Sequence, residues 1–227
     1  MANDRLIQLL NSKAILNIET VDTTSIVFAS IKKILKQFES KVKGEGVIDS
    51  RIKITFSDRG TFEAELKIAD EVIIFIMHTN AFVFDPSHPI MKSGYIGINA
   101  ANATCGMISI YNFQSDSLKY DRKNDIGILI ARMFVNKESH FFVEGRKQLG
   151  ILYNDYSTMV STSENLLSFI ETCIVYCLEI DVAVPPIDAM KQISVFEAMA
   201  YNLQSTLTAN TRLGFKFQNQ ANETPEA

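Results

Sequence analysis

The spacing of the apolar residues changes between residues 43 and 51, and this change constrains the fold more than any other feature. Residues 22–43 carry one apolar stripe at helical steps of three and four: Val27, Ile31, Ile34, Phe38 and Val42. This spacing predicts a helix that buries one face. We expect Thr23, Thr24 or Ser25 to cap its start, and Gly44 and Gly46 to end it. A separate amphipathic helix is expected over residues 4–18.

From Arg51 onward, apolar and polar residues alternate, which is typical of strands with one wet face. Residues 51–56 and 61–68 flank a turn at 57–60, so they predict an antiparallel hairpin. Arg51 and Lys53 would then pair across the hairpin with the acidic positions Glu63 and Glu65. The run Val72–Met77 is apolar at every position and predicts a central strand covered on both faces.

The rest of the chain adds further strands and then helices. Strands are expected over residues 81–84, 95–98, 107–113, 141–143, 149–153 and 213–217. The apolar steps in 126–135 favour a helix and leave a strand open, whereas 161–178 and 188–207 predict helices. We therefore predict an α+β fold in which a mainly antiparallel sheet (residues 50–155) is flanked by an N-terminal helix and two C-terminal helices. Residues 1–217 would form one domain, followed by a disordered tail at 218–227.

Charge and cysteine content narrow the class of protein. The net charge of −4 disfavours binding to nucleic acid, which depends on an excess of Lys and Arg. The N-terminus lacks the apolar core of a secretory signal, and no apolar run reaches the roughly 18 residues of a membrane span. Cys105, Cys173 and Cys177 form no CxxC pair and are expected to be buried thiols. These features predict a cytoplasmic protein with no membrane contact.

Two groups of residues could carry chemistry. His78 ends the covered strand, and Asp85 and His88 follow on a proline-rich loop. Imidazole and carboxylate side chains suit a divalent metal ion or an acid–base pair. The alternative interpretation is a histidine bonded to the backbone and an aspartate that stabilises a turn.

The second group contains Glu138, His140, Glu144 and Arg146. If residues 140–146 are extended, then His140, Glu144 and Arg146 share one face. A carboxylate two residues before a cation suggests a metal-dependent nuclease, in which the acid binds the metal ion and the cation steadies water and phosphate. A surface hairpin with alternating charge explains the same residues without any chemistry.

Two functions from different classes remain. The first is a non-enzymatic binding or assembly protein that requires no cofactor. It would use the stripe of the last helix, or a face of the sheet, for self-association or for a protein partner. The alternative is a metal-dependent hydrolase, perhaps acting on phosphodiesters, with Asp85 and Glu144 as metal ligands and a histidine as ligand or base. This alternative requires the two groups of residues to converge in the fold.

Overall fold

The computed structural model describes residues 2–44, 49–122 and 125–181. An antiparallel sheet of seven strands and a set of helices make up this part of the chain, as the α+β prediction requires. The strands are β1 (Ile54–Asp58), β2 (Glu63–Ile68), β3 (Glu71–Met77), β4 (Phe82–Val83), β5 (Thr104–Gln114), β6 (Ile128–Asn136) and β7 (Phe141–Gly145). The helices are α1 (Ala2–Leu9), η1 (Leu10–Ala14), α2 (Ile15–Gly44), η2 (Pro89–Lys92), α3 (Gly94–Ile98), η3 (Ala100–Ala103), α4 (Ser115–Lys119), α5 (Leu149–Leu152) and α6 (Ser163–Leu178).

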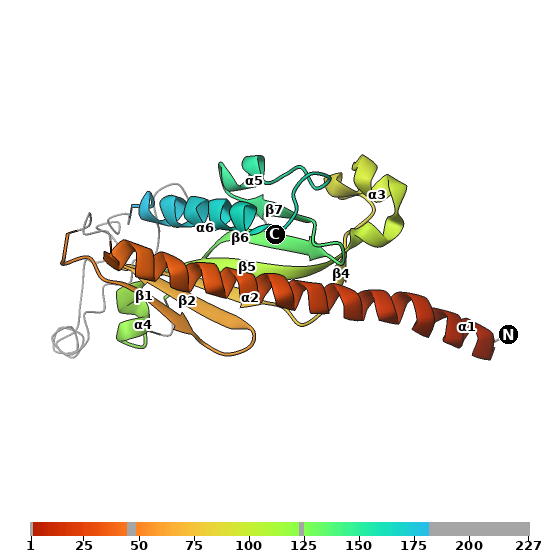
Figure 1. Cartoon of the computed structure of the whole chain (residues 1–227), viewed down its shortest axis with the longest axis horizontal. Helices are drawn as coiled ribbons and strands as arrows, with labels where there is room; N and C mark the ends of the chain where they lie inside the picture. Colours follow the sequence, from red (N-terminus) through yellow and green to blue (C-terminus); the bar gives the residue numbers. More distant parts are fainter. Residues whose placement is uncertain (1, 45–48, 123–124, 182–227) are drawn as a thin grey trace, which may run out of the picture.

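The two helices predicted near the N-terminus are one continuous helix in which η1 is a single π-helical turn. The predicted cap at Thr23–Ser25 is therefore wrong. The hydroxyls of Thr24 and Ser25 instead donate to carbonyls four residues earlier, at Thr20 and Val21, and the helix passes through this segment without a break. The first part of this helix projects beyond the sheet (Figure 1), and every residue from Asn3 to Lys13 is exposed.

The helix Asn3–Gly44 is long and apolar enough to cross a membrane by length and composition alone. Its second half nevertheless has the burial of a core helix, because Val27, Phe28, Ile31 and Leu35 are almost completely covered. A core helix passes the same length and composition test. The cytoplasmic location therefore stays a prediction.

The strands follow the order β1-β2-β3-β5-β6-β7, and β4 adds a short pairing to β5. The predicted hairpin is present as β1 and β2, with Ile54 opposite Ile68, and β3 is the covered strand expected at Val72–Met77. The predicted charge pairing across the hairpin is wrong, because Ser57 lies opposite Glu65 and Thr55 opposite Lys67. Arg59, in the turn, supplies the positive charge to Glu63 and Glu65 instead.

Three predicted elements have the wrong secondary structure. Residues 126–135, whose apolar steps favour a helix, lie mostly in strand β6, which is placed between β5 and β7. Because β6 is covered on both faces over much of its length, its apolar residues do not alternate, and their steps resemble those of a helix. Residues 95–98 and 149–153, both predicted as strands, form the short helices α3 and α5. Ser93 caps α3 by accepting a hydrogen bond from the amide of Tyr95.

Helices α2 and α6 pack side by side on one face of the sheet, here called the inner face (Figure 1). The main core lies between these helices and the strands; its largest buried members include Phe28, Phe75, Phe141, Phe169 and Ile110. Gly106 allows α2 to approach β5 closely, because a Cβ atom at this position would lie 2.1 Å from Oγ1 of Thr24. The helix predicted over 161–178 is confirmed as α6, and the hydroxyl of Thr162 caps it by accepting a hydrogen bond from the amide of Asn165.

The opposite, outer face carries a smaller apolar cluster over the end of β5, β6 and β7. The segment from Phe84 to Ala103 folds over this end and contributes Ile90 and Ile96, which pack with Phe134 and Phe142 of the sheet. The second predicted C-terminal helix (188–207), the strand at 213–217 and the tail at 218–227 lie outside the described residues. The apolar stripe of that last helix therefore lies outside them too.

Candidate functional site

A row of polar side chains crosses three adjacent strands on the outer face. In the strand register Ser109 of β5 lies beside Arg132 of β6, and Arg132 lies beside Glu144 of β7. The guanidinium of Arg132 forms an ion pair with Oε2 of Glu144. Sequence reasoning missed Ser109 and Arg132, because only the strand register reveals that they lie next to Glu144.

His88 joins this row from the loop before η2. Its Nε2 lies 2.7 Å from Oε1 of Glu144, so the two groups of residues singled out in the sequence do converge at this point. The amide of Ile90 donates to Nδ1 of His88 over 3.3 Å. A nitrogen that accepts this hydrogen bond carries no proton, so the proton of a neutral His88 lies on Nε2 and is donated to Glu144. His78 lies on the other side of the row, with Nε2 3.0 Å from Oγ of Ser109.

Every charged group in the row has a partner within the row. Glu144 is bonded to Arg132 and to His88. A cavity of about 590 Å³ lies beside His88 and Glu144, and its lining also includes Lys92 and Tyr156. The arrangement holds the loop that carries His88 against β7. It can bind a polar group or exchange a proton with one, but the described contacts are those of a clamp between two segments.

The remaining predicted site residues lie apart from this row. Asp85 is exposed, and its carboxylate accepts hydrogen bonds from the amide and hydroxyl of Ser87, which lower the pKa of Asp85. Glu138 accepts a hydrogen bond from Tyr95. Arg146 follows β7, and its amide donates to the carbonyl of Ile130. Among residues 2–44, 49–122 and 125–181, no three His, Cys, Asp or Glu side chains lie close enough to hold a metal ion. The metal-dependent hydrolase therefore stays a prediction without a ligand set in these ranges.

A second polar centre surrounds Tyr95 beside the end of β6 and the turn that leads into β7. Its hydroxyl donates to Oε2 of Glu138 over 2.6 Å and accepts from Nδ2 of Asn136 over 3.0 Å. The ring of His140 stacks on Tyr95 at 4.8 Å, and Nδ1 of His140 donates to the carbonyl of Tyr156 over 3.1 Å. Burial and the bond to Glu138 raise the pKa of Tyr95 to about 12. His140 and Glu138 are thus parts of a structural network around Tyr95.

The thiol of Cys105 is held in the same region without the features of a nucleophile. It is fully buried and lies 3.1 Å from the hydroxyl of Tyr156, which in turn bonds the carbonyl of Asn102 over 2.7 Å. Burial raises the pKa of Cys105 to about 12. Because the thiolate is the reactive form, Cys105 is a core residue, as are Cys173 and Cys177, which are also fully buried.

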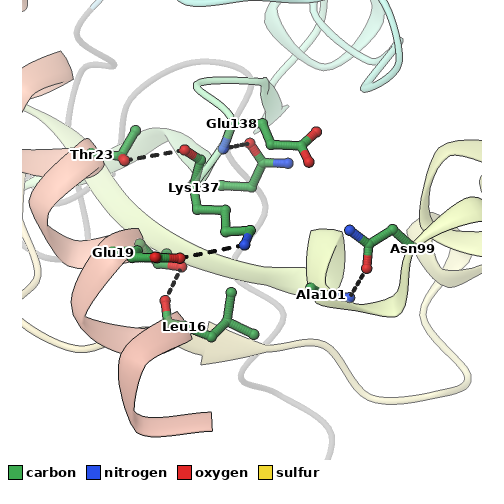
Figure 2. Close-up of polar contacts among 9 residues, drawn as sticks. Leu16, Glu19, Thr23, Asn99, Ala101, Lys137 and Glu138 are labelled. Carbon is green, nitrogen blue, oxygen red and sulfur yellow. Dashed lines mark hydrogen bonds and ion pairs between the residues drawn. The ribbon is translucent and has the colours of Figure 1, made fainter. Parts of the chain in front are cut away.

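A shallow cavity of about 600 Å³ lies beside the π turn of the N-terminal helix. Residues of η1 and α2 line one side, and residues 100, 101 and 104 together with Lys137 line the other. Figure 2 shows Lys137 pointing across this corner toward Glu19, with their charged atoms 3.4 Å apart. The hydroxyl of Thr23 donates to the carbonyl of Lys137 over 3.3 Å, which ties α2 to the turn between β6 and β7.

Large aliphatic side chains form an exposed row on the same helix. Its members are between 44% and 68% exposed and are Leu6, Leu10, Ile15, Ile18 and Ile26. Ile7 and Leu9 of the same helix are also exposed, and Leu9 is rotated by about 100° from Leu10, outside the row. The steps are four, five, three and eight residues, and the step of five crosses the π turn, which takes one more residue than an α turn. The row, here called the aliphatic stripe, therefore stays within an arc of roughly 100° on the helix. The exposed Asp22, one turn after Ile18, interrupts the row before Ile26. The uninterrupted part from Leu6 to Ile18 is roughly 18 Å long at about 1.5 Å per residue, and it lies opposite the side of α2 that packs on the sheet.

Comparisons with known proteins identify no relative: no family model matches the sequence, and no curated protein or solved structure is significantly similar to it.

Proposed function

We propose that this protein is a non-enzymatic assembly protein that self-associates through the aliphatic stripe. The observation that carries the proposal is the continuity of the stripe across the π turn, on a helix whose first residues, Asn3 to Lys13, are all exposed. Contiguous exposed apolar surface on a folded protein commonly marks an interaction site. An exposed helix whose large aliphatic residues share one face is the form of surface that another helix covers.

The distribution of polar residues supports the same proposal. Gln8 and Ser12 lie on the other side of the projecting helix, where they remain solvated when the stripe is covered. Full burial of a Leu or Ile side chain contributes about 1.5–3 kcal/mol, and the stripe residues are roughly half exposed. Covering each of them therefore stabilises an assembly by about 1 kcal/mol. Because a substitution removes the side chain from both copies, it weakens dimerisation by roughly 30-fold.

The test compares the full chain with two variants by sedimentation equilibrium over a range of protein concentrations. Leu10→Glu places a charge in the middle of the stripe, whereas Gln8→Glu adds the same charge on the opposite side of the helix as a matched control. We expect wild type and Gln8→Glu to associate and Leu10→Glu to remain a monomer, with an unchanged circular dichroism spectrum. A wild-type chain that is monomeric up to about 100 μM, where contacts worth about 5–6 kcal/mol would already produce dimers, overturns the proposal.

A further inference from the structure

We infer that the helix predicted over residues 188–207 packs on the outer face of β2 and β3 of its own chain. Two buried side chains on that face motivate the inference. Ile74 lies between Ile73 and Phe75, which belong to the main core, so Ile74 points to the outer face. Glu65 of β2 lies opposite Ile74 in the strand register and shares this face. Ile74 is only 6% exposed and Glu65 only 8%.

The described helices leave this burial without a cover. Helices α2 and α6 pack on β3 from the inner face, and the elements that pack closely on β2 are its neighbours β1 and β3. The outer apolar cluster contains neither Ile74 nor Val72, the next outward residue of β3. The backbone at Gly127 closes over the ring of Phe113, which lies opposite Val72, and so reaches only one end of this face. Because Ile74 is buried within a single copy, the remaining cover belongs to the same chain.

The composition of β3 supports a cover on both faces. The run Val72–Met77 is apolar at every position, as in strands that are buried between two layers. The acid on the neighbouring strand does not oppose an apolar cover, because Arg59 forms an ion pair with Glu65 and neutralises its charge.

The predicted last helix has the surface that this face requires. Its apolar residues recur at steps of three and four on one side: Ile193, Phe196, Ala200, Leu203 and Leu207. At about 1.5 Å per residue this side is roughly 20 Å long, which is about the width of four strands spaced roughly 4.8 Å apart.

The connection to α6 is long enough for this placement. Residues 182–187 separate the last described residue from the predicted helix, and Pro185 and Pro186 favour an extended connection. Seven extended steps reach about 23 Å, and helices on the two faces of a sheet lie about 20 Å apart, because packed layers are separated by roughly 10 Å. Helix α6 ends toward the same end of the molecule as α4 (Figure 1), so the chain can pass around the strand ends there.

This placement is independent of the proposed self-association and adds a third layer to the fold. The apolar stripe of the last helix is then used within the chain. The projecting N-terminal helix, whose residues Asn3 to Lys13 are exposed, stays free for a second copy.

Tryptophan fluorescence of the full chain tests whether the last helix is covered, because the native sequence contains no tryptophan. Phe196→Trp places an indole in the stripe, and Ser205→Trp is the matched control, since position 205 is rotated by about 180° from position 196. We expect emission at shorter wavelength and several-fold weaker quenching by acrylamide for Phe196→Trp than for Ser205→Trp. Equal emission and equal quenching in the two variants would overturn the inference.

A nitroxide label on the sheet tests where the helix packs. The native cysteines are fully buried, so the label attaches to Glu63→Cys, on the outer face of β2, or to the control Gln8→Cys, on the projecting helix. Combined with Phe196→Trp, we expect the label at position 63 to quench the indole several-fold more than the label at position 8. An indole that is shielded but not quenched from position 63 would place the helix elsewhere and overturn the inference.

The Leu10→Glu background separates this inference from the proposed self-association. We expect the shielding of the indole in Phe196→Trp to persist in Leu10→Glu and to be the same at all protein concentrations. Shielding that disappears in Leu10→Glu or on dilution would show that a second copy covers the stripe, which overturns this inference and leaves the proposed self-association in place.

Discussion

Leu10 and Ile15 lie on adjoining turns of the same exposed helix face although five residues separate their positions, because a π turn begins at Leu10. In an uninterrupted α-helix a step of five residues would rotate Ile15 by about 140° from Leu10. The π turn absorbs the extra residue and keeps the stripe in line. Turns of this kind are often found at functional positions.

The first prediction follows from this extra residue. Deletion of Ser12 alone converts the π turn into an α turn and leaves Leu6, Leu10 and the following isoleucines in one row, so self-association is retained. Deletion of both Asn11 and Ser12 rotates the projecting part by about 100° and divides the stripe, so association weakens. Sedimentation equilibrium of both variants checks this, and equal loss in the two would contradict it. Circular dichroism of the monomers controls for folding.

The second prediction concerns the contact between α2 and the sheet. A methyl group at Gly106 would lie 2.1 Å from Oγ1 of Thr24, so Gly106→Ala forces the helix away from β5. We expect a loss of about 1–3 kcal/mol in the free energy of unfolding by urea. Gly97→Ala is the matched control, since a Cβ there meets nothing within 4 Å, and its stability should change by less than about 0.5 kcal/mol. Equal stability of the two variants would show that α2 does not depend on this close approach.

Much of the fold could be predicted from residues whose periodicity reports a single buried face. Strands β1 and β2 alternate cleanly because their outer side is polar, and α6 shows both a cap and a helical stripe. The pattern failed at β6, where Phe134 faces outward and Met133 inward and both are buried. A strand covered on both faces leaves no alternation for sequence reasoning to use.

The candidate sites were less predictable, since each one depends on contacts between distant segments. His88 and Glu144 were both singled out in the sequence, but Arg132, which binds Glu144, is brought there only by the register of β6 and β7. The stripe was hidden for a different reason. The step of five residues from Leu10 to Ile15 does not fit a 3.6-residue period, so only the π turn reveals that they are neighbours.

The third prediction concerns the clamp between His88 and Glu144. Glu144→Gln keeps the shape of the side chain but removes the charge that binds Arg132, so the loop that carries His88 is held less firmly. We expect faster hydrogen exchange at the amide of Ile90, which bonds to His88, and a loss of about 1 kcal/mol in stability because the ion pair is partly exposed.

The control for this clamp is Asp49→Asn. That substitution removes a carboxylate from the Asp49–Arg51 ion pair, whose guanidinium is mostly exposed. Stability should then be unchanged within the error of the measurement, because exposed ion pairs contribute little. A Glu144→Gln variant with wild-type exchange at Ile90 would show that the ion pair does not anchor the loop.

The fourth prediction concerns alkaline pH and Tyr95. Burial and the hydrogen bond to Glu138 raise the pKa of Tyr95 to about 12 in the folded protein, whereas an unfolded tyrosine titrates near pH 10. Between these two values the unfolded chain releases the proton and the folded chain keeps it, so the free energy of unfolding falls as the pH rises from about 10 to 12.

Tyr95→Phe loses the bonds to Glu138 and Asn136 and is less stable near pH 8, but its stability declines less steeply above pH 10. Urea unfolding of both proteins at several pH values from about 9 to 11.5 measures the two slopes. Parallel slopes would mean that Tyr95 loses its proton at the same pH in the folded and unfolded chains.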